Sequence, residues 1–207
     1  MRILITAGPT REPIDPVRYL SNRSSGKMGY ALAKQAIALG HEVTLISGPV
    51  SIEPPEGIEI IRVETADKMF DAVKAKINDG DMAIFCAAVS DYRVADIADE
   101  KIKKDSNTLT LTLIKNPDIL GSARKDFGFS GTLVGFAAET ENIDTNAREK
   151  LERKDCDFIV ANDVSRSDIG FDRDANEVVI YSKDGSATRL ELASKDEISR
   201  QIIERIS

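Results

Sequence analysis

Continuous apolar runs alternate with helical patterns along most of this chain, and this alternation limits the folds available to it. Strands are expected at residues 2–6, 42–46, 59–63, 82–88, 132–137 and 158–161. The spacing of apolar residues predicts helices at residues 27–39, 66–77, 143–154 and 194–206. Strands that are apolar throughout are buried on both faces. The sequence therefore predicts an α/β, Rossmann-like fold, a parallel sheet with helices on both faces.

Two segments depart from this alternation. Residues 91–114 are first polar and then strand-like, because Leu109, Leu111 and Leu113 alternate with threonines. Residues 101–110 have the composition of a mobile flap. Near the C-terminus, strand-like residues at about 177–192 surround an Asp-Gly turn, which predicts a hairpin. We expect the Leu109–Leu113 strand and this hairpin to lie outside the Rossmann core, within a single domain of residues 1–207.

Composition and charge exclude several classes of protein. The 28 Lys and Arg residues face 35 Asp and Glu residues, so the formal charge is −7, and 42% of the chain is hydrophobic. These values are typical of a globular protein and argue against a disordered chain. An acidic chain is a poor general binder of nucleic acid, although a local basic cleft can exist on it. No apolar run approaches the roughly 18–20 residues of a membrane span, so we expect a cytoplasmic protein.

Few residues are available for nucleophilic or metal chemistry. His41 is the single histidine and follows Gly40 at a helix-to-strand junction, where a surface turn residue is expected. Cys86 and Cys156 lie in or beside apolar runs and are expected to be reduced core residues. A Ser-His-Asp triad and a multi-histidine metal site are therefore excluded. Any chemistry must depend on Lys, Arg, Asn, Asp and backbone groups.

One candidate anion site lies at the start of the first helix. The stretch from Ser24 to Gly29 places Gly, Ser and Lys where backbone N–H groups and the positive end of the helix dipole face a ligand. It is neither a P-loop nor a G-x-G-x-x-G fingerprint. The second strand also lacks the acid that would hold a ribose, which argues against a dinucleotide. A glycine-containing helix start made only for packing is the alternative.

Lysines supply a second candidate feature. Residues 101–104 form a basic run beside the expected flap, although a solvated strand edge would look the same. Lys150 and Lys154 lie four residues apart on one helix face, where like charges repel unless an anion lies between them. Neighbouring pairs of opposite charge could equally account for them. Lysines, helix dipoles and Gly/Ser turns together suit a nucleoside triphosphate, but none of them alone is specific.

Seven ordered motif blocks carry a resemblance that spans nearly the whole chain. They are residues 5–29 (ITAGPTREPIDPVRYLSNRSSGKMG), 87–93 (AAVSDYR), 100–104 (EKIKK), 115–120 (KNPDIL), 134–140 (VGFAAET), 161–164 (ANDV) and 170–171 (GF). In this order they closely resemble the phosphopantothenoylcysteine synthetase family of coenzyme A biosynthesis. In many bacteria this enzyme is the C-terminal half of a bifunctional flavoprotein.

The resemblance implies a two-step ligation. The carboxylate of phosphopantothenate attacks the α-phosphate of a nucleotide, CTP in most bacterial members, and pyrophosphate leaves. The amine of cysteine then attacks the acyl carbon of the acyl-cytidylate, and CMP leaves. Such transfers need positioning and charge stabilisation more than a histidine base. Magnesium is expected on the triphosphate, held mainly by phosphate oxygens and water, so no protein ligand is assigned. No flavin is expected in this chain.

The resemblance also implies roles for individual residues. The triphosphate would be held by a cradle of Gly8, Ser24, Gly26 and Gly29. The base and ribose would be held by Pro117, Asp118, Ile119, Leu120, Phe136 and Asn162. Lys150 and Lys154 would also contact the nucleotide. Phosphopantothenate contacts are expected from Asn22, Ala87, Ala88 and Asp91. Lys101 would stabilise the charge of the first step, whereas Asn22, supported by Arg18, would serve the second. The segment after Lys101 would close over the site and exclude water.

Several alternatives remain open at this point. In the family the excursion helps to build a homodimer whose sites draw on both subunits, so a dimer is expected. The chain starts at the first strand, which fits either a monofunctional gene product or a domain excised from a fusion with a flavin-dependent decarboxylase. A non-catalytic nucleotide-binding module, an ATP-using ligase and a nicotinamide-dependent reductase are the competing functions. The missing ribose acid argues against the reductase.

Overall fold

A central sheet of eight strands organises the computed structural model, which describes residues 1–104, 107–139, 141–163 and 174–207. Its strands are β1 (Arg2–Ala7), β4 (Glu42–Ser47), β5 (Glu59–Arg62), β6 (Met82–Phe85), β9 (Thr132–Glu139), β10 (Phe158–Asp163), β11 (Ala175–Ser182) and β12 (Ala187–Ser194). Their order is β12-β11-β10-β9-β6-β1-β4-β5, and the six strands from β5 to β10 in this order are parallel. The predicted α/β, Rossmann-like class is confirmed.

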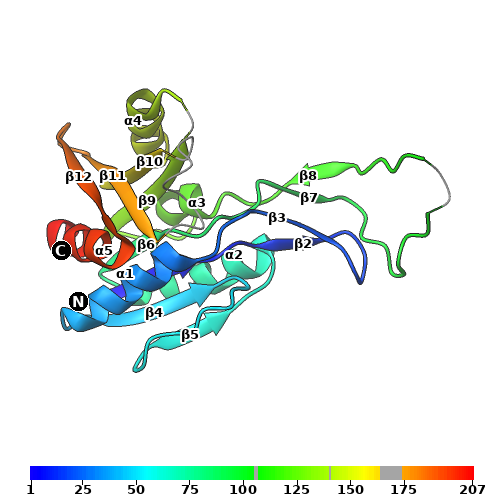
Figure 1. Ribbon diagram of the computed structural model, residues 1–207, viewed down its shortest axis with the longest axis horizontal. Coiled ribbons are helices and arrows are strands. Elements are labelled where there is room, and N and C mark those ends of the chain that lie inside the picture. The colour runs from blue at the N-terminus through cyan, green and yellow to red at the C-terminus, as the bar shows by residue number, and fades with distance from the viewer. Residues whose placement is uncertain (105–106, 140, 164–173) are drawn as a thin grey trace.

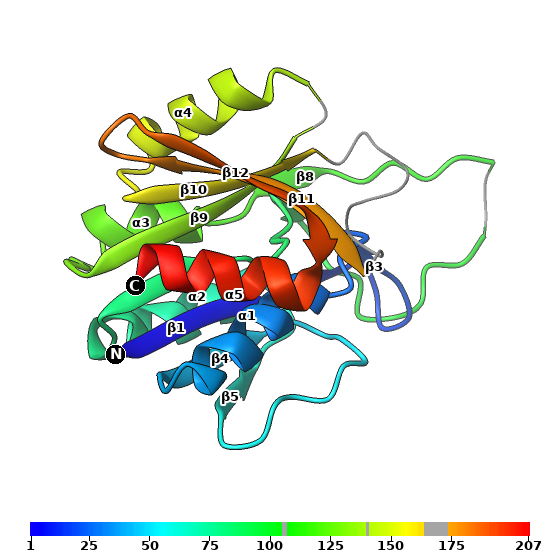
Figure 2. The same cartoon turned by 60° about the vertical axis from the view of Figure 1, so that its left-hand side comes forward.

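Helices cover both faces of this sheet. On one face, α1 (Lys27–Ala38) and α5 (Lys195–Ile206) lie side by side (Figure 2) and bury Leu32, Ala36 and Ile202 against β1 and β6. The opposite face carries α2 (Ala66–Lys76), the short η1 (Ile77–Asp79), α3 (Ile119–Lys125) and α4 (Ile143–Arg153). Each face therefore has its own hydrophobic core, and the sheet separates the two.

Local sequence signals set the ends of these helices. The Thr65 hydroxyl accepts a hydrogen bond from the Lys68 N–H (3.3 Å) at the start of α2, and the Ser194 hydroxyl accepts one from the Glu197 N–H (3.2 Å) at the start of α5. Threonine and serine are favoured N-caps because their hydroxyl oxygen accepts a bond from a free N–H of the first turn. Gly40 ends α1 with φ +82°, a conformation that glycine adopts without strain. Among the helices of the described residues, none is long and apolar enough to span a bilayer.

Two predictions about strands outside the Rossmann core were wrong. The C-terminal hairpin belongs to the central sheet, because β11 pairs antiparallel with β10 and thereby extends its edge. The strand predicted at Leu109–Leu113 is shorter and begins later, as β8 (Leu113–Lys115), which pairs with β7 (Tyr92–Val94). Leu109 is 55% exposed. An alternating pattern forms a stable strand only where one face can be buried, and this segment has no such face within the chain.

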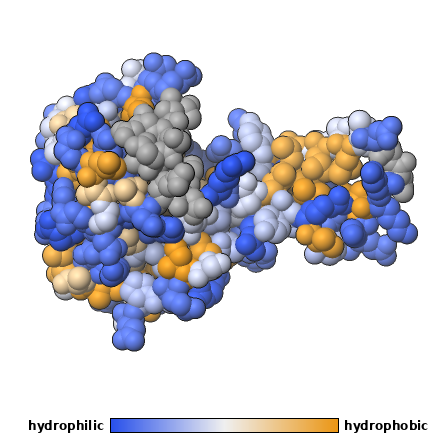
Figure 3. All heavy atoms as spheres, in the orientation of Figure 1, coloured by the Kyte–Doolittle hydropathy of each residue, from blue (hydrophilic) through white to orange (hydrophobic). Residues whose placement is uncertain are grey.

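An arm projects from the sheet, as Figure 1 shows, and we define it as residues 11–23, 91–104 and 107–115. It contains β7, β8 and a second pair, β2 (Arg11–Pro13) and β3 (Tyr19–Ser21), which the sequence did not predict. Among the described residues, seven of the ten large apolar side chains that are exposed lie in the arm. They are Val17, Tyr19, Tyr92, Ile97, Leu109, Leu113 and Ile114. Figure 3 shows apolar surface over this projecting part of the molecule.

The buried carboxylate of Asp15 joins the two halves of the arm. It accepts hydrogen bonds from the backbone N–H groups of Val17 (2.9 Å), Arg18 (2.9 Å) and Ile102 (3.1 Å) and from the Arg18 guanidinium. The guanidinium also donates to the Ile102 carbonyl oxygen (3.0 Å). The Arg18 charge and these donors hold the pKa of Asp15 far below its usual range, despite its burial. Arg18 is thereby fixed beside the segment that follows Lys101.

Candidate active site

The strand order reverses between β1 and β6, and this reversal creates a crevice at the carboxyl ends of the strands. From β1 the chain moves to β4 and β5 on one side, then returns to β6 and continues to β9 and β10 on the other. Ligands of open α/β sheets bind at such a switch point. Here residues 86–89 leave the sheet after β6, where the Ala87 N–H donates to the Thr6 hydroxyl (3.3 Å) and the Ala88 N–H to the Gly8 carbonyl oxygen (2.9 Å).

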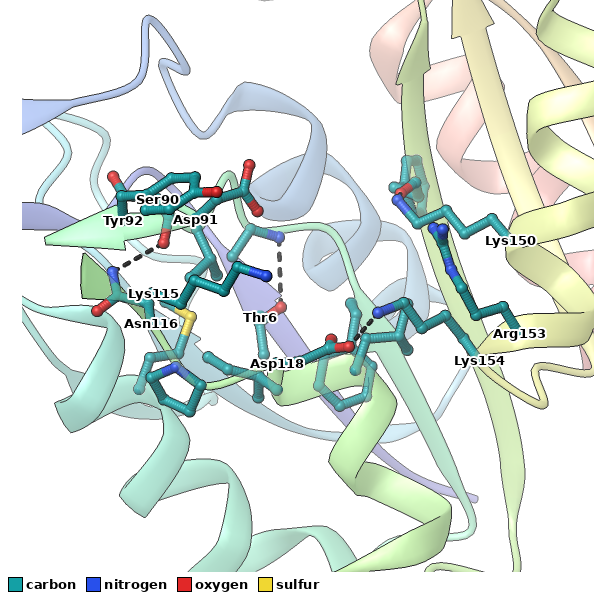
Figure 4. Close-up of a pocket in the computed structure, with 18 residues that line it drawn as sticks. Thr6, Ser90, Asp91, Tyr92, Lys115, Asn116, Asp118, Lys150, Arg153 and Lys154 are labelled. Atoms are coloured by element: carbon teal, nitrogen blue, oxygen red, sulfur yellow. Dashed lines mark hydrogen bonds and ion pairs between the residues drawn. The ribbon is translucent and has the colours of Figure 1, made fainter. Parts of the chain in front are cut away.

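A pocket of 600 Å³, here called pocket A, opens on the face of the sheet that α2, α3 and α4 cover. It gathers the predicted nucleotide residues at positions 117–120 with Phe136, Lys150, Lys154 and Asp91. Figure 4 shows the cations of α4 reaching in from one side, while Lys115 reaches toward them from β8. Four cationic side chains line this pocket, more than its two carboxylates, which suits a polyphosphate.

Electrostatics in pocket A follow from burial and pairing. Lys150 donates to the Phe136 carbonyl oxygen (2.7 Å), and burial lowers the pKa of its ammonium, a trend that Glu139 partly opposes. Burial raises the pKa of Asp118, but its ion pair with Lys154 and its bond from the Gly121 N–H outweigh burial and lower that pKa overall. Through the bond from Gly121, Asp118 is the N-cap of α3, a helix that the sequence analysis did not predict.

A second pocket of 260 Å³, here called pocket B, lies on the face that α1 and α5 cover. It gathers the predicted residues of both substrates, namely Asn22, Ser24, Gly26, Gly29, Ala87, Ala88, Phe136, Lys150 and Asn162. The side-chain nitrogen of Asn22 donates to the Ala88 carbonyl oxygen (2.9 Å), which fixes its carboxamide at the mouth. Ala87, Val89, Phe136 and Lys150 line both pockets, so the two meet over the ends of β6 and β9.

Two glycines at the start of α1 have packing roles besides lining pocket B. A Cβ on Gly29 would lie 2.5 Å from the Ala7 Cβ, so only glycine lets α1 approach β1 this closely. Gly26 has φ +79° and is the N-cap of α1 without a side-chain hydrogen bond to that cap. The packing interpretation of this helix start and the anion-binding interpretation are therefore compatible. In either case the first N–H groups of α1 lie beside pocket B.

Three predicted site residues line neither pocket. Gly8 ends β1 with φ +74° and supports Ala88 through its carbonyl oxygen. Arg18 and Lys101 are exposed on the arm, tied together through Asp15 and Ile102 as described above. Val164, Gly170, Phe171 and Thr140 of the motif blocks, and residues 105–106 of the expected flap, lie outside the described residues.

Sequence reasoning missed several residues that line the pockets. Arg153 lies on the same face of α4 as Lys150 and Lys154, so its spacing could have indicated it. Lys115 was quoted only as part of a motif block. Asn176 and Lys195 reach pocket B from the C-terminal hairpin and α5. No local signal marks those two, because β11 and α5 come to the pocket only through the tertiary fold.

The remaining candidates for reactive or metal-binding groups agree with an inert role. Cys156 is buried and Cys86 is half-buried, both are free thiols, and burial raises the pKa of each to about 12. Across the described ranges, no three His, Cys, Asp or Glu side chains gather as ligands of a metal ion. Pocket A offers the carboxylate of Asp91 beside its cations, which fits a magnesium ion that arrives on phosphate oxygens and keeps several waters.

Comparison with known proteins decides the family. The family model described as the DNA/pantothenate metabolism flavoprotein C-terminal domain matches residues 1–207. The chain belongs to this family. It is 50% identical over 206 residues to the coenzyme A biosynthesis bifunctional protein CoaBC of Vibrio vulnificus strain YJ016, and the match covers 99% of this chain and 51% of that protein. The CoaBC protein of Escherichia coli strain K12 is 46% identical over 209 residues, covering 100% and 51%.

Solved structures agree with this fold. The crystal structure of the C-terminal domain of a CoaBC protein matches with a TM-score of 0.83 at 42% identity, covering 99% of this chain and 93% of that one. A Cab2 mutant in complex with phosphopantothenate-cysteine matches in fold, with a TM-score of 0.76 at 19% identity, covering 99% and 85%. The chain spans about half the length of the curated bifunctional relatives it matches.

Proposed function

We propose that this chain is a phosphopantothenate–cysteine ligase that uses CTP and forms an acyl-cytidylate. The observation that carries the proposal is the pair of pockets that meet over the ends of β6 and β9. A ligase of this kind must bring a nucleotide and a carboxylate together from two sites. This chain belongs to the DNA/pantothenate metabolism flavoprotein C-terminal domain family, and its relatives are named as CoaBC proteins. Both facts support coenzyme A biosynthesis as the setting.

Pocket A suits the nucleotide and pocket B the phosphopantothenate. Pocket A has the larger volume, and the cations of α4 lie where a triphosphate would be neutralised. Pocket B holds Asn22, Ala87 and Ala88, which the family resemblance associates with phosphopantothenate. This division brings Ser24, Gly26 and Gly29 to the phosphopantothenate side, so the anion at the start of α1 is the phosphate of that substrate.

The shared wall is where the reacting atoms would meet. The phosphopantothenate carboxylate attacks the α-phosphorus, the bond to the bridging oxygen breaks, and pyrophosphate leaves with that electron pair. The cysteine amine then attacks the acyl carbon, loses a proton to solvent, and CMP leaves. Lys150 lies in both pockets and presents its ammonium to the charge that develops between them. Magnesium on the triphosphate would neutralise further charge, with Asp91 within the same pocket.

We further propose a homodimer formed through the arm. Its exposed apolar patch is larger than scattered surface residues would give, and such patches mark interaction sites. Arg18 and Lys101 lie on the arm rather than in the pockets of their own chain, which supports a role beside the site of a second copy. Light scattering should give twice the chain mass, and Ile114→Asp should shift it toward the monomer. A monomeric mass for the unaltered chain would exclude the dimer.

Pyrophosphate release tests the activity directly. The chain is incubated with phosphopantothenate, cysteine, magnesium and either CTP or ATP. Release that needs both CTP and phosphopantothenate supports the proposal, whereas release with ATP alone keeps the ligase and changes the nucleotide. Nucleotide binding without any release would favour a non-catalytic nucleotide-binding module. Binding of a dinucleotide would instead favour a reductase.

Two variants test the division of labour between the steps. Lys101→Gln should block the formation of the acyl-cytidylate, with Lys104→Gln as the matched control on the same exposed segment. Asn22→Asp should let the acyl-cytidylate accumulate, because its formation continues while its conversion by cysteine fails. Single-turnover analysis of the intermediate separates the two results. Equal loss of both steps in each variant would contradict these roles.

A further inference from the structure

The carboxamide of Asn176 is the most unusual polar group in the molecule. Asn176 is only 3% exposed, and it lines pocket B from the start of β11. Its Oδ1 is the one buried side-chain polar atom of the described residues that has no hydrogen-bond partner. A buried acceptor without a donor is costly, and native structures rarely keep one. Because Asn176 lines pocket B, a ligand in that pocket is a candidate source of the missing donor.

The lining of pocket B near Asn176 carries positive charge, while the Asp174 carboxylate interacts with Lys195 from outside this pocket. Lys195, the first residue of α5, is 6% exposed and lines the same end of pocket B. None of the described residues that line this pocket is Asp or Glu, although the whole chain carries a charge of −7. The nearby Cys86 thiol stays neutral, since burial raises its pKa to about 12. The first turn of α1 adds backbone N–H groups. This end of the pocket therefore suits an anion that carries a hydrogen-bond donor close by.

Geometry selects the end of the substrate that binds here. The reacting carboxylate must reach the wall shared with pocket A, which Ala87, Phe136 and Lys150 form. Asn176 and Lys195 line pocket B and not pocket A, and they belong to β11 and α5, on the face away from α2, α3 and α4. The opposite end of phosphopantothenate carries a phosphate and, beyond a dimethyl-substituted carbon, a secondary hydroxyl. The apolar side chains of Met28, Cys86 and Ala138 line the same pocket beside these polar groups.

We propose that Asn176 and Lys195 form the subsite for this far end of the substrate. The Asn176 carboxamide oxygen accepts a hydrogen bond from the substrate hydroxyl, and Lys195 with the start of α1 holds the phosphate. The assignment rests on the proposed function, because it takes phosphopantothenate as the ligand of pocket B. It makes the C-terminal hairpin and α5 part of the binding site as well as of the core.

A ligand-and-residue cycle tests the hydrogen bond. Calorimetric titration measures the affinity of the full chain and of Asn176→Leu for phosphopantothenate and for its analogue without the hydroxyl. The unaltered chain should bind phosphopantothenate about tenfold or more tightly than the analogue, because the analogue leaves Oδ1 buried without a donor. Asn176→Leu should bind the two equally. Asn78→Leu, which removes a carboxamide on the opposite face, should keep the preference.

A charge-matched pair tests the phosphate contact. Lys195→Gln should raise the KM for phosphopantothenate and leave the KM for CTP unchanged. Lys34→Gln is the control: Lys34 lies in α1 outside pocket B, and its ammonium pairs with Asp196, the residue after Lys195 in α5. Both KM values of this variant should stay unchanged. Thermal unfolding checks that each variant folds.

The outcomes separate this subsite from the proposed function. If the unaltered chain releases pyrophosphate with CTP but shows no preference for the hydroxyl, or if Asn176→Leu keeps that preference, the subsite is refuted while the ligase stands. If the unaltered chain neither binds phosphopantothenate nor releases pyrophosphate, the proposed function fails and the subsite fails with it.

Discussion

The contact between Gly29 and Ala7 sets two physical effects of opposite sign against each other. Replacing glycine by alanine within a helix stabilises it by about 0.5–1 kcal/mol, because alanine loses less backbone freedom on folding. At Gly29, however, the new Cβ would lie 2.5 Å from the Ala7 Cβ and 3.1 Å from the Ala7 Cα. Ala7 is a fully buried residue of β1, so neither atom can move without shifting the sheet or the helix. Overpacking of this kind costs roughly 1–3 kcal/mol.

The packing cost should exceed the gain in helix propensity. Gly29 is only the third residue of α1, where the propensity gain is near its lower limit. We therefore expect Gly29→Ala to lower the free energy of unfolding by about 1–2 kcal/mol. Urea denaturation with linear extrapolation measures this change in the free energy of unfolding. Comparing Lys34→Ala with Lys34→Gly at an exposed position of α1 gives the propensity difference in this helix without a clash.

A double variant identifies the clash as the cause. Ala7→Gly removes the nearest of the two atoms, so Gly29→Ala combined with Ala7→Gly should be more stable than the sum of the single effects predicts. A difference of about 0.5 kcal/mol or more would exceed the usual error of additivity. If Gly29→Ala stabilises the protein, or if the two effects simply add, the close approach of α1 and β1 does not govern this position.

Three further predictions follow from charges described above. Asp15→Asn should lower the urea midpoint at pH 7. Its difference from the unaltered chain should shrink as the pH falls below about 3.8, because a carboxyl whose pKa is lowered by folding stabilises the protein fully above its unfolded pKa and loses this effect as the pH falls toward its folded pKa. Lys150→Met should raise the KM for CTP about tenfold or more in pyrophosphate release, while Glu152→Met on the exposed face should not. Alkylation of Cys86 should be far slower at pH 8 than that of a free cysteine, because its pKa is near 12. Bound phosphopantothenate should slow the alkylation further. Rapid alkylation of the free chain would contradict the raised pKa, and an unchanged rate with phosphopantothenate bound would contradict its binding beside Cys86.

The fold was largely predictable because strands and helices of the core follow from periodicity. Buried strands such as β6 and β9 are apolar throughout, and Thr65 and Ser194 mark helix starts by their own chemistry. The errors occurred where pairing decides the structure. The sequence indicates a hairpin at β11 and β12 but not that its first strand pairs with β10. Likewise, Leu109–Leu113 has a strand pattern without a face to bury it.

The candidate site was predictable in composition and not in arrangement. The family resemblance supplied the residues that gather at the switch point, but it did not separate them into two pockets on opposite faces. That division depends on how the loop after β6 turns over the strand ends. Asn176 and Lys195 could not be found from local patterns, because they come to pocket B only through the packing of α5 against β11 and α1.

The separation of the two cores by the sheet has a consequence for how such a protein can change over time. Substitutions under α1 and α5 alter the walls of pocket B, whereas substitutions under α2, α3 and α4 alter those of pocket A. Only the loop after β6, Phe136 and Lys150 belong to both. The lining of one pocket can therefore diverge between descendants of one ancestor without disturbing the other pocket, and the few shared residues are the ones that cannot vary independently.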